Sequence, residues 1–69
     1  MTPNEIFDNY MAGLSPRARI AKSRDLCKLG DVKPYQISNW RKGRCSIPLP
    51  WQRKINEITG DQVFAIAEN

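Results

Sequence analysis

The chain has 69 residues and a mass of 7.9 kDa, which is enough for one small domain over residues 1–69 and too little for a large core. It contains no histidine and two cysteines, so a zinc site built from His and Cys is excluded and at most one disulfide can form. The net charge is +4, no apolar run approaches membrane-spanning length, and the start MTPNE is polar, so we expect a soluble cytoplasmic protein without a membrane segment.

The first predicted helix covers residues 3 to about 12. The sequence TPNE has the capping-box spacing, with Thr2 as the N-cap and Pro3 at the first helical position. Gly13 can adopt the left-handed conformation that ends a helix. The apolar residues that recur at helical spacing, and so predict a core-facing side, are Ile6, Phe7, Tyr10, Met11 and Leu14.

The second predicted helix covers residues 16 to 29. Ser15 and Pro16 repeat the cap-then-proline signal, and Gly30 is expected to end the helix. One face of this helix carries Ile20, Ser23, Leu26 and Cys27. The rest of its surface carries Arg17, Arg19, Lys22, Arg24 and Lys28. We therefore expect a helix that is both buried and strongly basic. We also expect two free thiols, with Cys27 in the core and Cys45 in a loop.

The third predicted helix begins at Pro34 and is terminated by Gly43, a length of about ten residues. Its apolar residues Ile37 and Trp40 are three apart and lie on one side, which we expect to be buried. The opposite side, which we call the outer face, is then formed by Tyr35, Ser38, Asn39 and Lys42.

A fourth helix begins around residues 49 and 50 and closes at Thr59-Gly60, with Trp51, Ile55 and Ile58 on one face. The predicted fold class is therefore all-α, a compact bundle of four to five helices. The tail from residue 61 to 69 fits either a short helix or an extended strand. Its apolar residues need burial, either on their own domain or against a second subunit; they are Val63, Phe64 and Ile66.

Charge is concentrated in the middle of the chain. All eleven Lys and Arg lie between residues 15 and 54, where two carboxylates oppose them, so this segment carries a net charge of +9. Residues 1–14 carry −2 and residues 55–69 carry −3. This distribution indicates one basic face suited to a polyanion, although a solvated surface around ordinary helices would look the same.

The outer face of the third helix has the groups needed to read base edges in the DNA major groove. The amides of Asn39 or Gln36 can bond adenine N6 and N7, and Lys42 can reach guanine or phosphate. Tyr35 can touch a thymine methyl group or donate to phosphate, and Ser38 is small enough for close approach. Four cations are placed to hold the DNA backbone: Arg41 and Arg44 at the end of the third helix, and Arg17 and Arg19 at the start of the second.

The pattern LC…GDV…ISNWRKG…IP…INEITG, spread over residues 16–60, resembles the Cro-type (lambda-repressor-like) helix-turn-helix regulators of phages and prophages. The resemblance implies a motif formed by the second and third helices, with the third as the recognition helix. The core of this motif would be Leu26, Cys27, Val32, Ile37 and Trp40. Its groove-facing residues would be Lys33, Tyr35, Gln36, Ser38, Asn39 and Lys42.

The chain departs from the Cro-type pattern at two positions. The turn glycine that such motifs favour would fall at Asp31, whereas the glycine here is Gly30, so we expect a longer or differently shaped turn. Lys33 replaces the usual hydroxyl or acidic cap of the recognition helix; it caps poorly but suits a phosphate. Both departures concern where the third helix starts.

Other functions fit the sequence less well. Catalysis is disfavoured because there is no histidine, neither cysteine has a neighbour pattern typical of a nucleophile with its base, and the four glycines are isolated. RNA binding is disfavoured because no aromatic pair is displayed on a sheet. The main alternative is a protein-binding module that presents the same basic face to an acidic partner. We expect a transcriptional regulator that binds double-stranded operator DNA as a homodimer, with no cofactor and no small-molecule ligand.

Overall fold

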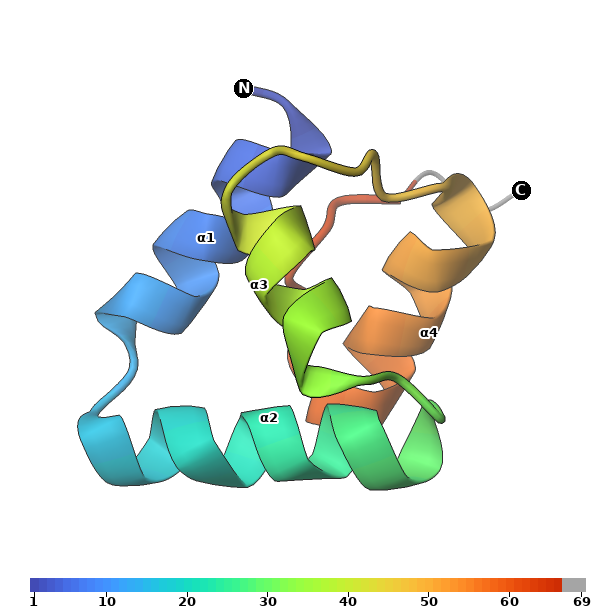
Figure 1. Ribbon diagram of the computed structural model, residues 1–69. Helices are drawn as coiled ribbons and strands as arrows, with labels where there is room; N and C mark the ends of the chain where they lie inside the picture. The colour runs from blue at the N-terminus through green and yellow to red at the C-terminus, as the bar shows by residue number, and fades with distance from the viewer. Residues whose placement is uncertain (67–69) are drawn as a thin grey trace.

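The computed structural model describes residues 1–66, and this part of the chain forms helices without any strand. The helices are α1 (Pro3–Gly13), α2 (Pro16–Leu29), α3 (Pro34–Arg41) and α4 (Leu49–Thr59). In Figure 1, α2 runs across the base of the molecule, and α1, α3 and α4 lie above it. The main packing contacts join α1 to α3, α2 to α4 and α2 to α3. The predicted all-α fold with four helices is confirmed.

Local capping explains where the first two helices begin. The Thr2 hydroxyl accepts a hydrogen bond from the Glu5 N–H at 3.2 Å, and the Glu5 carboxylate accepts from the Thr2 N–H at 3.2 Å. The Thr2 hydroxyl also donates to this carboxylate at 3.1 Å, and the hydrogen bonds from the Thr2 backbone and then from its hydroxyl hold the pKa of Glu5 below its ordinary value. Ser15 caps α2 by accepting from the Ala18 N–H at 3.2 Å. Both predicted helix starts are confirmed.

The helix ends agree with the sequence at α2 and α4 and differ at α1 and α3. Gly30 follows α2 and Gly60, with φ of +73°, closes α4, as predicted. The prediction for Gly13 was wrong. Gly13 is still the last residue of α1 and does not have a positive φ, and the extended backbone of Leu14 ends the helix. Helix α3 has eight residues rather than ten, and Gly43, at φ of +75°, lies in the turn beyond it.

The hydrophobic core is centred on Phe7, whose side chain is fully buried. Its ring centroid lies 6.1 Å from that of Trp40 on α3 and 6.5 Å from that of Phe64 in the tail. Burying an aromatic or large aliphatic side chain stabilises the fold by about 1.5–3 kcal/mol. Within residues 1–66, the buried apolar residues are Phe7, Met11, Leu26, Val32, Ile37, Trp40, Ile47, Ile55 and Phe64.

As far as residue 66 the tail is irregular and forms neither the short helix nor the strand that the sequence allowed. Phe64 nevertheless enters the core, and the Asn56 side chain holds its backbone by accepting from the N–H and donating to the carbonyl, both at 2.9 Å. Val63 and Ile66 are partly buried against the same core. The apolar side chains of the tail are thus covered by their own domain as far as residue 66, and Ala67 lies outside the described residues.

Only part of the predicted apolar face of α2 is buried. Leu26 is fully buried and Cys27 packs against the core, but Ile20 is 60% exposed. The expected burial of this face was therefore wrong at Ile20, in the N-terminal half of the helix. Cys27 and Cys45 are free thiols, half-buried and exposed respectively, in agreement with the sequence.

Candidate functional site

Helix α3 has one buried side and one open side. Ile37 and Trp40 are 6% and 1% exposed, whereas Tyr35 is 66% exposed and Lys42 is exposed. Ser38 and Asn39 are partly exposed between these two sides. The predicted burial of Ile37 and Trp40 is confirmed, and the outer face is open at Tyr35 and Lys42 and partly open at Ser38 and Asn39.

The turn before α3 is tight and depends on two special positions. A Cβ atom at Gly30 would lie 2.7 Å from the Leu26 carbonyl oxygen and 3.2 Å from the Ile58 side chain, so only glycine fits there without movement. Asp31 follows with φ of +54°, a left-handed conformation that Asp tolerates better than most residues. Val32 is then buried. The left-handed residue thus stands where the Cro-type pattern favours glycine, although this chain has aspartate.

Lys33 is the N-cap residue of α3. Its backbone is extended, with φ of −81° and ψ of 150°, and no side-chain hydrogen bond caps the helix. The Lys33 side chain is exposed and is therefore left for another partner. The predicted start of α3 at Pro34 is confirmed, and its weak cap is a consequence of lysine at this position.

The end of α3 is fastened to α1 by Asn4. Its Nδ2 donates to the Trp40 carbonyl at 2.9 Å and to the Cys45 carbonyl at 2.6 Å. The Arg44 N–H donates back to the Asn39 carbonyl at 2.9 Å. The last turn of α3 and the loop after it are therefore held in one geometry, with the exposed side chain of Arg44 beside it.

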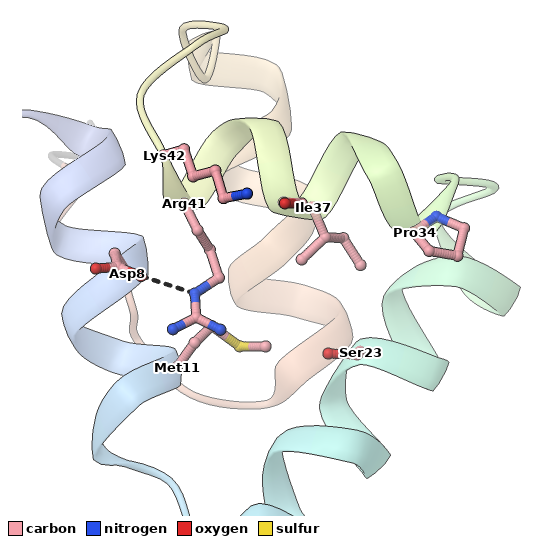
Figure 2. Close-up of a pocket in the computed structure, with 8 residues that line it drawn as sticks. Asp8, Met11, Ser23, Pro34, Ile37, Arg41 and Lys42 are labelled. Atoms are coloured by element: carbon pink, nitrogen blue, oxygen red, sulfur yellow. Dashed lines mark hydrogen bonds and ion pairs between the residues drawn. The ribbon is translucent and has the colours of Figure 1, made fainter.

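Arg41 forms an ion pair with Asp8 of α1, with 2.7 Å between Nε and Oδ1. Figure 2 shows this guanidinium between α1 and α3, at the edge of a hollow enclosed by α1, α2 and α3. The hollow has a volume of about 410 Å³, and Ser38 and Lys42 also line it. One predicted backbone-contacting cation is thus already paired within the molecule.

The cations of α2 are also divided between internal and open positions. The Arg19 guanidinium donates to three carbonyls at the end of α1, those of Met11, Ala12 and Leu14, at 2.9–3.4 Å. Lys22 donates to the Thr59 carbonyl at 2.5 Å, and its Nζ lies 3.7 Å from an Asp61 carboxylate oxygen. Arg17, Arg24 and Lys28 are exposed.

Asp61 also accepts a hydrogen bond from the Tyr10 hydroxyl at 2.7 Å, which ties α1 to the segment after α4. Burial first, and this hydrogen bond and the nearby carboxylate charge second, raise the pKa of Tyr10 to about 12. Lys22, Tyr10 and Asp61 thus form a structural link rather than part of the open basic surface.

Two residues beside α3 were not identified from the sequence. Trp51 is half-buried, and its ring packs at a tilt of 56° against that of Trp40, with 5.3 Å between centroids. Lys54 lies over its ring, with Nζ 4.9 Å from the centroid. Trp51 also lines a second hollow of about 260 Å³ with Lys33, Tyr35 and Gln36. The i, i+3 spacing of Trp51 and Lys54 on a helix was the available signal.

Of the predicted contact residues, α3 and its flanks bring eight together: Lys33, Tyr35, Gln36, Ser38, Asn39, Arg41, Lys42 and Arg44. Arg17 and Arg19 lie separately, in the first turn of α2.

Within residues 1–66, no group of three or more Cys, Asp or Glu side chains is gathered as a metal site would require. In the same part of the chain, no helix is long and apolar enough to cross a membrane. Comparison of the chain with family models, curated proteins and solved structures finds no match.

Proposed function

We propose that this protein is a sequence-specific double-stranded DNA-binding protein, a transcriptional regulator of the Cro-type helix-turn-helix class. In this proposal α3 enters the major groove, and α2 supports it from behind. The protein would act in the cytoplasm of a bacterial or phage-infected cell, as a homodimer at a palindromic operator with half-sites about one helical turn apart.

The single observation that carries the proposal is the orientation of α3. Its two apolar anchors, Ile37 and Trp40, are buried, whereas its polar outer face is exposed at Tyr35 and Lys42 and partly exposed at Ser38 and Asn39. Two hollows border this face, one towards α1 and α2 and one towards α4, so α3 stands between them as a ridge. A ridge with amide, hydroxyl and ammonium groups has the shape and the chemistry that a major groove accepts.

The turn between α2 and α3 gives additional support. It comprises residues 30–33, and α3 packs against α2 directly after it. The left-handed Asp31 matches the position at which the Cro-type pattern uses glycine. Because the guanidinium of Arg19 is bonded to α1, the exposed Arg17 is the better phosphate partner at the start of α2.

Selection of bound sequences from a random duplex pool tests the proposal. We expect one preferred sequence, a stoichiometry of two chains per site, and a loss of about a thousandfold in affinity between 50 and 200 mM salt if about six phosphates are contacted. A protein that binds no duplex, or all duplexes equally, contradicts the proposal. Salt-resistant binding to an acidic protein would instead favour the protein-binding module.

Two substitutions separate base reading from backbone contact. Asn39→Ala should reduce discrimination at one base pair by about 1–3 kcal/mol, because the amide can bond only one base edge. Arg44→Ala should weaken binding to all duplexes alike and lower the salt slope by about one. Gln62→Ala after α4 and Arg53→Ala on α4 are matched controls, since both residues are exposed and border a hollow that no residue of α3 lines. Unchanged discrimination by Asn39→Ala would remove Asn39 from base reading.

A further inference from the structure

Asp8 is a carboxylate on a surface that would otherwise attract a polyanion. Asp8 borders the hollow among α1, α2 and α3. It also borders a third, polar hollow of about 430 Å³ between α1 and the end of α3. Arg41 and Lys42 line both hollows as well. A negative charge placed there would oppose DNA binding unless it served the cations beside it.

The ion pair engages only the Nε of Arg41. Only Nε donates to Asp8, and within residues 1–66 the two Nη groups make no hydrogen bond. The Arg41 side chain keeps 30% of its surface exposed. In Figure 2 the guanidinium lies beside Asp8 with its Nη atoms pointing away from the α3 backbone, along the hollow. An Nη pair presented in this way can bind two oxygens of one phosphate.

We propose that Asp8 is a positioning residue, which holds the Arg41 guanidinium so that its two Nη groups bind a DNA phosphate next to Lys42. The inference rests on the proposed function, and Asp8 itself touches no DNA. A free arginine side chain has many rotamers, and ordering it on binding costs affinity. Because Asp8 orders Arg41 in the free protein, the side-chain entropy of Arg41 is lost on folding and not on binding DNA.

The sign of the effect of removing Asp8 distinguishes positioning from simple charge. If Asp8 only repels phosphate, Asp8→Ala strengthens binding, whether or not Arg41 is present. If Asp8 positions Arg41, Asp8→Ala weakens binding although it removes a negative charge. The weakening must then disappear when Arg41 is absent, because nothing remains to be positioned.

The experiment measures affinity for the preferred duplex and its salt dependence in the wild type, Asp8→Ala, Arg41→Gln and the double variant. We expect Asp8→Ala to lose about threefold to tenfold in affinity, on specific and random duplexes alike, and to lower the salt slope by about one. In the Arg41→Gln background, Asp8→Ala should leave affinity unchanged or raise it. Glu57→Gln, which removes an exposed carboxylate on α4, controls for charge and should not weaken binding.

A second readout needs no DNA. The Arg41 Nε–H resonance in the free wild-type protein should exchange slowly with water; this protection should be lost in Asp8→Ala and only reduced in the isosteric Asp8→Asn, whose neutral amide oxygen can still accept the hydrogen bond. Thermal unfolding of each variant verifies that binding is measured on folded protein. The inference is overturned by tighter binding of Asp8→Ala, by equal losses in both backgrounds, or by an unprotected Arg41 Nε–H in the wild type. A wild type that binds no duplex refutes the proposed function instead.

Discussion

The two ends of α3 are held by different kinds of contact. The C-terminal end depends on side chains of α1, because Asn4 bonds two carbonyls there and Asp8 pairs with Arg41. The N-terminal end depends on the backbone of the preceding turn, where Gly30 is sterically required and Asp31 is left-handed. One end is therefore fixed by residues more than thirty positions away, and the other by its immediate neighbours in sequence.

This difference indicates which substitutions would change the position of each end of α3. At the C-terminal end, a change in α1 alters the position of Arg41 and the loop 42–46 without touching them. At the N-terminal end, a change within residues 30–33 alters the entry of the helix directly. Substitutions can therefore disturb each end of α3 separately.

The largest expected effect is at the N-terminal end. Gly30→Ala should destabilise the protein by about 1–3 kcal/mol, because the new Cβ atom would meet the Leu26 carbonyl at 2.7 Å and the Ile58 and Val32 side chains at 3.2–3.3 Å. Chemical denaturation measures the loss. Gly13→Ala is the matched control, since nothing lies within 4 Å of its added methyl group and its φ is not positive. It should be neutral or stabilising by up to about 1 kcal/mol. Equal effects of the two substitutions would show that the turn is not sterically constrained.

A smaller effect is expected at the C-terminal end. Asn4→Ala should cost about 1–2 kcal/mol, because two carbonyls of the α3 end and its loop lose their donor while water can partly replace it. Amide hydrogen exchange should increase around residues 40–46 and remain unchanged at residues 30–33. Faster exchange at both ends would mean that the two ends are coupled, and the comparison would fail.

The sequence predicted what local signals determine. Proline after an extended cap marked the helix starts, and glycine marked the ends of α2 and α4, so the order and approximate bounds of the four helices were predictable. The buried side of α3 followed from the spacing of Ile37 and Trp40. Each of these features depends on residues within one or two turns of one another.

The sequence could not predict contacts between distant residues. Nothing local indicates that Arg19 bonds the end of α1, that Arg41 pairs with Asp8, or that Ile20 is left uncovered. The same holds for residues 61–66, where the sequence allowed a helix or a strand, whereas the chain is irregular and Asn56 holds Phe64 in place. A count of cations therefore overestimates the open basic surface, because some serve the fold.

The mildest change should improve stability and weaken binding together. Lys33→Ser supplies a hydroxyl at the N-cap of α3, where no side chain now accepts from the first turn, and should stabilise the protein by about 0.5–1 kcal/mol. It also removes an exposed cation proposed to meet a phosphate, so affinity should fall for all duplexes and the salt slope by about one. Lys33→Ala removes the same charge without providing a cap, and should show the binding loss without the gain in thermal stability. If the two variants are equally stable, the hydroxyl does not cap α3; if neither weakens binding, Lys33 contacts no phosphate. A gain in stability together with a loss of DNA affinity in Lys33→Ser would indicate that lysine at the N-cap of α3 serves binding, since stability alone would favour serine at this position.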